Sequence, residues 1–543
     1  MRNGLPEPEF DAVIVGAGFA GLYMLHSLRE AGLSAVVYDA APEVGGTWYW
    51  NRYPGCRCDI ESMQYSFQFD DDLQQDWTWS ERYASQPELL AYIKHAAERF
   101  DLRRDISLET RVAAAEFDQS NDYWTVATQG AGAAADGATT MVTARHLILG
   151  VGCLSTIEMP TFADSHLFEG ELIHTGRWPQ GDVDLAGKRV GVIGTGSSGI
   201  QSIPLIAEQA DQLFVFQRTP NYVVPAQNRP LASHEVAQIK SSYGELRATA
   251  WKSLSAFEFE RNTGSVFDMD DVDRAAQFEK YWDIGGLPFL GSFGDLLTNK
   301  AANEAVIEWW KGKVRQIVDD PRVAELLIPN GDVFGGKRLC AGTNYFETYN
   351  RSNVSLVDVS ESGIERFTPT GLVAAGTDYD LDVIVCATGF DAMTGSVVRI
   401  DITGLGGQTI AEKWADGPHT YLGLGIAGFP NLFNMQGPGS PSVFATMVTG
   451  IEHQGDWITD CIRSMNTNGH TRIEATADSE AAWVERVAQV AEPSLRSNCD
   501  SWYIGSNIAG KPRVFMPWIG GFPAYVEACS RVAENEYEGF VLS

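Results

Sequence analysis

The sequence has 543 residues, of which 44% are hydrophobic and 11% aromatic, and its formal net charge is −31 at pH 7. This length predicts roughly two to four domains, and the negative charge argues against binding to nucleic acid or anionic membranes, which favour basic surfaces. No apolar run approaches the ~20 residues that span a bilayer, and the acidic, proline-containing start of the chain does not resemble a signal peptide.

A glycine-rich turn near the N-terminus has the surroundings of a dinucleotide-binding site. Residues 12–15 predict a buried strand, a helix with apolar residues at helical spacing follows, and residues 35–38 predict a second strand. The turn is a G-x-G-x-x-G motif formed by Gly16, Gly18 and Gly21. Asp39 ends the second strand, 18 residues after the last glycine (39 − 21). Such glycines let the backbone approach a pyrophosphate at the helix N-terminus, and the acid accepts hydrogen bonds from ribose hydroxyls.

A second glycine-rich turn repeats this pattern and differs at its last position. Residues 189–193 predict the first strand and residues 212–216 the second. The turn is formed by Gly194, Gly196 and Gly199. Arg218, 19 residues after the last glycine (218 − 199), stands where the first copy has its acid. A guanidinium pairs with a 2′-phosphate that a carboxylate would repel. We therefore expect FAD at the first turn and NADP at the second, as in a flavoenzyme that NADPH reduces.

Two strands that run into small residues predict how the chain passes between two nucleotide-binding domains. They lie in residues 144–155 and 379–392. We expect an α/β fold with two Rossmann-like domains, FAD and NADP, and a mostly helical insertion. The predicted parts are 1–150 and 387–543 for FAD, 151–224 and 331–386 for NADP, and 225–330 for the insertion.

Several shorter segments have predicted structural roles. In the insertion, an apolar stripe over residues 302–317 predicts a helix that Pro321 ends, with Trp309 and Trp310 in the core. The Gly- and Ala-rich residues 128–140 predict a hairpin tip or loop.

Two motifs resemble those of the Baeyer–Villiger monooxygenases that use FAD and NADPH. The pattern F-x-G-x-x-x-H-x-x-x-W-P is matched by Phe168, Gly170, His174, Trp178 and Pro179. The pattern G-G-x-W-x4-Y-P-G-x3-D is matched by Gly45, Gly46, Trp48, Tyr53, Pro54, Gly55 and Asp59. The resemblance covers almost the whole chain. Segments such as "GPGSPS" (437–442) look more like the phenylacetone and steroid branch than the cyclohexanone branch, which indicates aryl or bulky ketones.

The resemblance implies a reaction and its residues. Members of this family convert ketones to esters or lactones with NADPH and O₂: a flavin peroxide anion attacks the carbonyl, and the Criegee adduct rearranges. A fixed cation stabilises such anions in a site that excludes water. By resemblance, Arg338 is this catalytic arginine, Asp59 orients it, and Lys337 joins Arg218 at the 2′-phosphate. The other implied cofactor-binding residues are Gly46, Thr47, Trp48, Tyr53, Tyr65, Val112, Met447, Ser197, Ser198, Thr219 and Trp502. Trp48, Tyr53 and Tyr65 pack around FAD, and Trp502 is either core or near the nicotinamide and the substrate.

His174 is either a joint in the connector between the domains or a catalytic group. The joint is favoured for two reasons. The peroxide anion itself attacks the ketone, so no general base is required. Family members also resemble one another in this segment, which suggests that it couples domain movement to the active site. No carboxylate or second histidine stands near it at a metal-ligand spacing, so we expect no metal.

The residues also bear on competing functions. A flavin monooxygenase that oxidises sulfur or nitrogen is the nearest alternative, and Trp178-Pro179 discriminates against it. A disulfide reductase needs a redox cysteine pair, but Cys56 and Cys58 are too close for an unstrained bridge in an extended segment. A redox-sensing scaffold would not need both Asp59 and Arg338.

The eight scattered cysteines (Cys56, Cys58, Cys153, Cys340, Cys386, Cys461, Cys499, Cys529) form no disulfide framework and indicate a reducing cytoplasm. The expected partners are a small ketone and O₂, with no nucleic acid, membrane or obligate protein partner.

Overall fold

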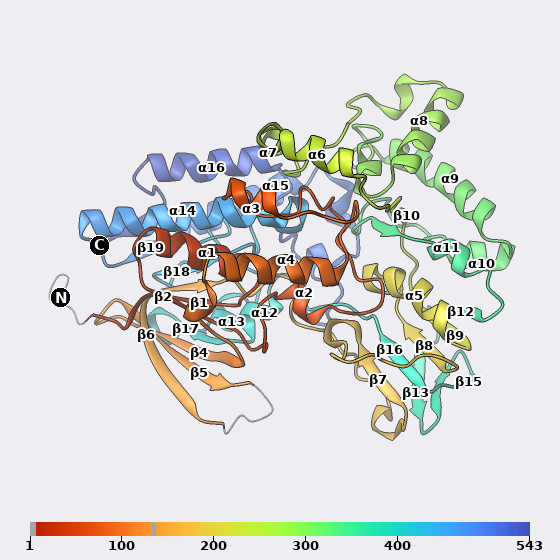
Figure 1. Cartoon of the computed structure of the whole chain (residues 1–543), viewed down its shortest axis with the longest axis horizontal. Helices are drawn as coiled ribbons and strands as arrows, with labels where there is room; N and C mark the ends of the chain where they lie inside the picture. The colour runs from red at the N-terminus through yellow and green to blue at the C-terminus, as the bar shows by residue number, and fades with distance from the viewer. Residues whose placement is uncertain (1–6, 132–136) are drawn as a thin grey trace.

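Two main sheets lie toward opposite ends of the molecule (Figure 1). The computed structural model describes residues 7–131 and 137–543; residues 1–6, part of the segment tested for a signal peptide, lie outside this description. The first sheet has the order β17-β4-β5-β6-β1-β2-β3, and β18 pairs with β6. Its strands are β1 (Phe10–Val15), β2 (Ala35–Tyr38), β3 (Ile106–Ser107), β4 (Thr110–Asp118), β5 (Tyr123–Gly130), β6 (Thr139–Leu149), β17 (Asp401–Thr403) and β18 (Leu432–Asn434).

The second sheet is entirely parallel, with the order β12-β9-β8-β16-β7. Its strands are β7 (Glu171–His174), β8 (Arg189–Ile193), β9 (Gln212–Gln217), β12 (Val354–Asp358) and β16 (Val383–Cys386). Strands of a parallel sheet covered on both faces are continuously apolar, and β16 is buried at all its positions. The chain leaves the first sheet after β6, builds the second sheet, and returns at β17, which confirms the predicted α/β class. The exact domain boundaries remain predictions.

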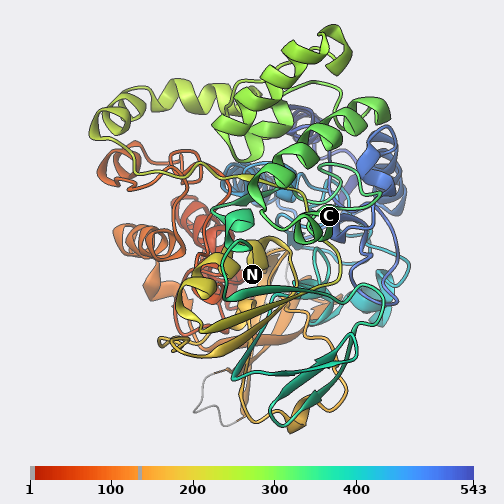
Figure 2. The same ribbon diagram turned by 90° about the vertical axis from the view of Figure 1, so that its right-hand side faces the viewer.

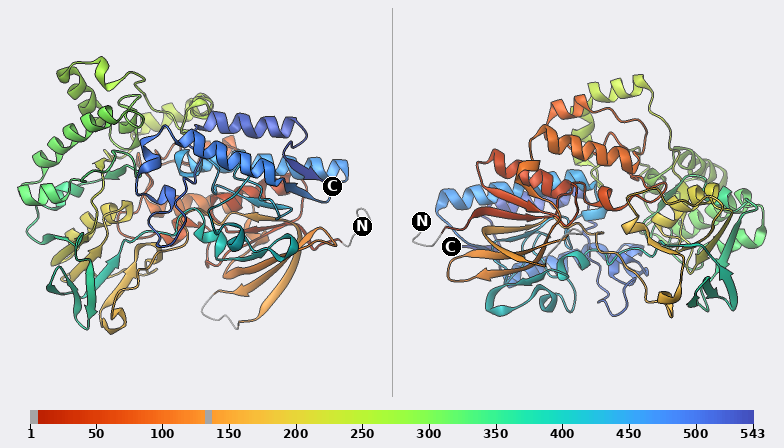
Figure 3. Two further views of the ribbon diagram at one scale, coloured as in Figure 1. Left: turned by 180° about the vertical axis from the view of Figure 1, so that it is seen from behind. Right: turned by 60° about the horizontal axis from the view of Figure 1, so that its bottom comes forward.

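Helices cover the sheets and fill the space between them. On the first sheet, α1 (Phe19–Glu30) packs against α14 (Met447–Asn468), which contacts α16 (Phe522–Glu534), and all three lie on the side away from β4 and β5 (Figures 1 and 3). The second sheet carries α5 (Ser197–Gln209). The other helices outside the insertion are α2 (Thr47–Trp50), α3 (Asp71–Asp76), α4 (Gln86–Arg99), α11 (Tyr345–Thr348), α12 (Gly395–Val398), α13 (Ile410–Lys413) and α15 (Ala477–Ala491).

Residues 225–330 are mostly helical, as expected, and the last residue of β10 (Val223–Pro225) is their only part in a strand. These helices are α6 (Ser233–Ser241), α7 (Tyr243–Lys252), α8 (Asp271–Ile284), α9 (Lys300–Ile317) and α10 (Pro321–Leu326), and they stand over the second sheet (Figure 2). Trp310 is fully buried, and its indole N–H donates to the Val223 carbonyl at 2.8 Å. Trp309 is half-buried against Phe278 and Trp282.

The prediction that Pro321 ends a helix was wrong. Helix α9 ends at Ile317, and Pro321 is the first residue of α10, where its missing N–H costs no hydrogen bond. Asp320 caps this helix by accepting from the Arg322 N–H at 2.8 Å.

Smaller sheets complete the structure. They pair β10 with β11 (Cys340–Gly342), join β13 (Ile364–Thr368), β14 (Gly371–Ala374) and β15 (Thr377–Asp380), and pair β19 (Ile473–Ala475) with β20 (Phe540–Leu542). The predicted loop over 128–140 lies between β5 and β6, which form an antiparallel pair as far as Gln129 and Thr139; residues 132–136 are outside the described residues.

Candidate active site

The two glycine-rich turns have the same packing geometry. Gly16 and Gly194 both have a φ of +104°, and a side chain on either would begin 2.6 Å from a carbonyl oxygen, that of Gly150 or Ala387. These two carbonyls belong to the small-residue stretches after β6 and β16. The third glycine of each motif lets the helix pack on its strand: a Cβ on Gly21 would lie 1.8 Å from the Gly16 oxygen, and one on Gly199 would lie 2.3 Å from that of Gly194. Only glycine fits at these positions.

The helix N-termini behind both turns are suited to a diphosphate. Gly18 and Gly196 are the N-caps of α1 and α5, and neither helix receives a side-chain cap. The first N–H groups of a helix have no partner within it and favour an anion. Beyond the adjoining backbone, no described atom lies within 4 Å of a Cβ built on Gly196, and of the described residues only the Gly46 backbone is that close to one on Gly18. The residues present therefore fit two dinucleotides.

The acid and the arginine at the ends of the second strands are in different environments. The Asp39 carboxylate accepts from the backbone N–H groups of Ala17 at 2.6 Å and Ala41 at 2.7 Å. Burial raises the pKa of Asp39, and these two hydrogen bonds oppose that shift. Each carboxylate oxygen keeps acceptor capacity for a ribose hydroxyl. Arg218 is exposed, and no described residue forms an ion pair with it.

Arg338 and Asp59, separated by 279 residues in the sequence, form a bidentate ion pair. The Nε–Oδ2 distance is 2.6 Å and the Nη2–Oδ1 distance is 2.8 Å. The Nη1 group donates to the Val443 carbonyl at 2.8 Å. Burial by itself lowers the pKa of Arg338, but the charge and hydrogen bonds of Asp59 raise it above the ordinary range. The guanidinium is thus a fixed cation in three hydrogen bonds.

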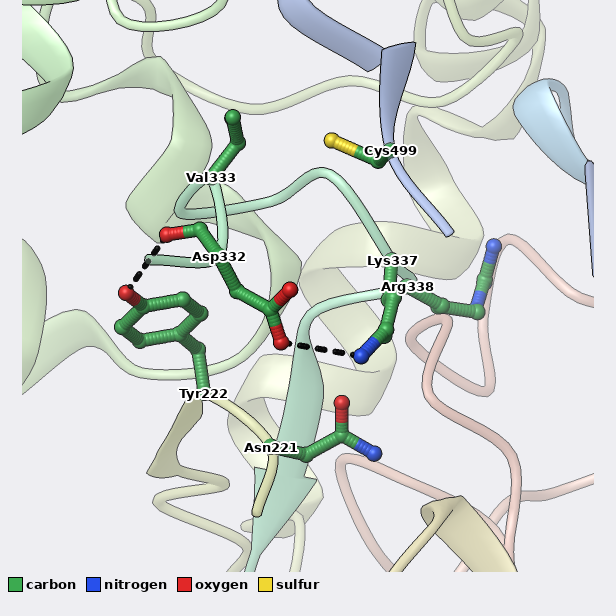
Figure 4. A pocket seen from close by; sticks show the side chains of 7 residues that line it. All are labelled: Asn221, Tyr222, Asp332, Val333, Lys337, Arg338 and Cys499. Atoms are coloured by element: carbon green, nitrogen blue, oxygen red, sulfur yellow. Dashed lines mark hydrogen bonds and ion pairs between the residues drawn. The ribbon is translucent and has the colours of Figure 1, made fainter. Parts of the chain in front are cut away.

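Lys337 points away from Arg338 toward a small cavity (Figure 4). Its Nζ lies 2.9 Å from Asp332 Oδ2, and the Asp332 carbonyl accepts from the Tyr222 hydroxyl at 2.9 Å. Asn221 and Cys499 also line the cavity. The predicted partner of Lys337 was a cofactor phosphate, so its pairing with Asp332 was not foreseen.

The predicted aromatic contacts of the flavin lie beside the first turn. Trp48 is buried, and its ring lies 5.9 Å from that of Tyr65 in an edge-to-face arrangement. The Tyr53 hydroxyl instead donates to Gln201 of α5 at 2.9 Å.

The remaining predicted residues lie on several elements, and Gly46, Ser197 and Ser198 are at the two turns. Thr47 and Gly46 lie at the start of α2 and Met447 at the start of α14. Ser197 and Ser198 open α5, and Thr219, whose carbonyl accepts from the Thr195 hydroxyl at 3.0 Å, is exposed. Val112 is buried within β4, where its backbone pairs with Thr128.

An apolar cluster lies next to the ion pair. It contains Val443, whose carbonyl contacts Arg338, and the half-buried Trp502 and Met447. Its other members are Cys153, Leu154, Ala392, Met393 and Met516. Cys153 and Met393 were not predicted as members of this cluster; their only signal in the sequence was their position beside the two small-residue stretches.

His174 is the last residue of β7 and is 3% exposed. Its Nδ1 accepts from the Gly176 N–H at 2.9 Å, and its ring meets the edge of Phe390. Burial lowers the pKa of His174 to about 4, so the imidazole is neutral at pH 7. The hydrogen bond fixes the turn that follows β7, on the path from β7 to β8 within the second sheet.

The cysteines are all free and buried, and burial raises the pKa of Cys56 to about 12. No cluster of three metal-ligating side chains and no helix long and apolar enough to cross a membrane occurs in residues 7–131 and 137–543.

The fold and the site together define a flavoprotein with two dinucleotide sites and an arginine–aspartate pair between them. A family model described as flavin-binding monooxygenase-like matches residues 11–268. Acetone monooxygenase (methyl acetate-forming) of Gordonia sp. (strain TY-5) is 43% identical, over 98% of this chain and 99% of its own.

Solved structures extend the similarity to the whole fold. An oxidized steroid monooxygenase bound to NADP is 49% identical, with a TM-score of 0.93 over 98% of this chain and 99% of its own. A complex of the enzyme OTEMO with FAD and NADP is 40% identical, with a TM-score of 0.94 over 99% and 100% of the two chains. The chain belongs to the Baeyer–Villiger monooxygenases, within the flavin-binding monooxygenases. It is an FAD- and NADPH-dependent enzyme that oxygenates ketones to esters or lactones.

Proposed function

We propose that the Arg338–Asp59 pair is the catalytic centre and that Arg338 stabilises the negative charge that develops on the ketone oxygen. The observation that carries this proposal is the bidentate pair at 2.6 and 2.8 Å beside an apolar cluster. A guanidinium has five N–H groups; two face Asp59 and one faces the Val443 carbonyl, so two remain for an oxyanion. When bound, FAD reduced by NADPH activates O₂ and supplies the oxygen atom that is inserted.

Asp59 has two roles in this proposal. It fixes the direction of the guanidinium, because two parallel hydrogen bonds allow only one arrangement of the fork. It also keeps the charge of Arg338 in a partly buried place, where removal of the carboxylate would leave the cation without a partner. A cation already in position needs no reorganisation when charge develops.

The substrate is an apolar ketone of aryl or bulky type. The apolar cluster beside Arg338 is made of thioether, thiol, aliphatic and indole groups, which bind apolar groups and adapt to irregular shapes. The 49% identity to a steroid monooxygenase supports a bulky substrate. Trp502 and Met447, both at the half-buried edge of the cluster, would contact the substrate and the cofactors.

The packing of the two glycine turns supports one cofactor at each sheet. FAD lies at the turn of Gly18, with Asp39 at its ribose and Trp48, Tyr53 and Tyr65 around it; NADP lies at the turn of Gly196, with Arg218 and Lys337 at its 2′-phosphate. The boundaries 150, 224, 330 and 386 separate the two nucleotide-binding domains and the insertion. The enzyme acts in the cytoplasm on small molecules without a protein partner or nucleic acid, as its eight free thiols and net charge of −31 support.

Product analysis tests the proposal. The wild-type enzyme, Arg338→Ala and Arg315→Ala are incubated with NADPH, O₂, and aryl, cyclic and steroid ketones with one thioether, and products are identified by mass spectrometry. Arg315, which forms an exposed bidentate pair with Glu325, is the matched control. We expect Arg338→Ala to bind FAD and to be reduced by NADPH but to lose about 100-fold or more of ester formation. Ester formation by Arg338→Ala at the control rate would contradict the assignment, and sulfoxide without ester from the wild type would contradict ketones as substrates.

A further inference from the structure

Gln201 links helix α5 to the loop that leads to Asp59. Its Oε1 accepts from the Tyr53 hydroxyl at 2.9 Å and from the Arg57 N–H at 3.4 Å, and its Nε2 donates to the Arg57 carbonyl at 3.1 Å. One side chain therefore makes three hydrogen bonds across the boundary between the two nucleotide-binding units. Its two amide atoms hold both backbone groups of Arg57, two residues before Asp59.

The loop that Gln201 holds approaches the helix very closely. Gly55 has a φ of +81°, and a Cβ on it would lie 2.3 Å from the Gln201 carbonyl oxygen, so only glycine allows this contact. On its other side the loop is fixed to the first unit, because the Cys58 N–H donates to the Ala84 carbonyl at 3.1 Å. The position of Asp59 is thus determined from both sides, and Gln201 supplies the contact from α5.

The same helix also contacts the segment that carries Arg338. Ser197, the first residue of α5, has its hydroxyl 3.3 Å from the Cys340 sulfur, and the Cys340 thiol donates to the Arg338 carbonyl at 3.4 Å. Helix α5 therefore contacts the segments on both sides of the ion pair, Asp59 through Gln201 and Arg338 through Ser197. A shift of α5 would change the geometry of the pair.

We propose that Gln201 is a positioning residue that transmits the position of α5 to Asp59 and thereby to Arg338. The inference rests on the proposed function, in which the N-terminus of α5 takes the NADP pyrophosphate. It predicts that occupancy of this N-terminus orders the 53–59 loop, so that the guanidinium is aligned when NADP is bound. Without the side-chain bridge, NADPH still reduces the flavin, but the oxygen is lost as hydrogen peroxide.

The test compares Gln201→Met, which keeps the length and removes all three hydrogen bonds, with Gln209→Met. Gln209 ends the same helix, and among the described residues its side chain bonds only the Leu205 carbonyl of that helix. For each holoenzyme we would measure ester and hydrogen peroxide per NADPH oxidised, kcat and KM for NADPH, and amide hydrogen exchange of residues 53–59 with and without NADP⁺.

For Gln201→Met we expect at least a threefold fall in ester per NADPH, a KM for NADPH within threefold of the control, and loss of the NADP⁺-induced protection of residues 53–59. Gln201→Glu, which keeps the two accepted hydrogen bonds, should lie between Gln201→Met and the wild type. Ester yield and protection equal to those of Gln209→Met would overturn the inference. If Gln201→Met does not fold, Tyr53→Phe removes one of the three bonds and must lower the ester yield, or the inference is wrong. Absence of ester from the wild type would refute the proposed function instead.

Discussion

Replacement of Glu452 by Gln should change the pH dependence of stability, because this carboxyl is buried where α14 meets the segment around Gln68. Glu452 is 4% exposed, and one of its oxygens accepts from the N–H groups of Gln68 at 2.7 Å and Phe69 at 3.3 Å. The buried Arg247 of α7 does not form an ion pair with it; its donors reach Gln74, the Gln64 carbonyl and Ser66. Burial raises the pKa of Glu452 from 4.5 to about 8, although the two N–H groups and Arg247 act in the opposite direction.

The sign of the effect follows from linkage. A raised folded-state pKa contributes stability that is fully present below the unfolded pKa of 4.5 and is lost as the pH rises through about 8. Within this window the wild type loses about 1.4 kcal/mol per pH unit relative to Glu452→Gln. An unfolding entropy of about 2.1 cal/mol/K per residue, applied to 543 residues that unfold together, converts this to roughly 1 °C in Tm per pH unit.

The assay is the Tm of the FAD-loaded enzyme between pH 5 and 9 at one scan rate, for the wild type, Glu452→Gln and the control Glu527→Gln. Glu527 is exposed on α16, so its replacement removes the same charge from the surface. We expect the Tm of Glu452→Gln minus that of the wild type to rise by roughly 3 °C from pH 5 to pH 8 and then to level off. A difference that stays constant, or that matches the control, would refute the buried, protonated carboxyl.

Two further variants test the proposed cofactor phosphate site and the packing of the insertion. Asp332→Asn should free Lys337 and tighten the binding of adenosine 2′,5′-bisphosphate, measured by calorimetry, by up to about fivefold, since a partly exposed ion pair contributes about 0.2–1 kcal/mol. The control Asp283→Asn, on the exposed end of α8, should leave this affinity unchanged. Weaker binding by Asp332→Asn would show that Asp332 does not compete with the phosphate for Lys337. Trp310→Ala should cost about 3–5 kcal/mol and lower the Tm by several degrees, whereas the half-buried Trp309→Ala should cost less; equal losses would show that burial of Trp310 is not the cause.

Local patterns predicted the parts of the fold that depend on neighbouring residues. Both glycine turns were foreseen because strand, turn and helix follow one another within about 30 residues of chain, and the structure places Gly16 and Gly194 in the same conformation. The strand expected in residues 379–392 is shorter: β15 ends at Asp380 in a separate small sheet, and β16 begins at Val383. Between them the Asp382 carboxylate turns back to pair with Arg189, a long-range contact that no local pattern contains.

The site itself depends on tertiary contacts. The pairing of Arg338 with Asp59 came from the family resemblance, since nothing in a separation of 279 residues predicts it. The Val443 carbonyl, the Asp332 carboxylate and Gln201 were missed for the same reason: each is an ordinary polar group until the fold brings it to an arginine, a lysine or a loop.

The ion pair is also a contact between the two predicted nucleotide-binding domains, because Asp59 belongs to the first and Arg338 to the second. Full separation of the domains would expose the carboxylate and the guanidinium to water, where each charge is stable alone. A small misalignment would instead leave the cation partly buried without its partner, which is costly. Intermediate positions are therefore disfavoured relative to full docking or full separation. The residue proposed to stabilise the reacting oxygen thus also favours the arrangement in which the two units meet beside the apolar cluster. The charge is then available only when the site is assembled.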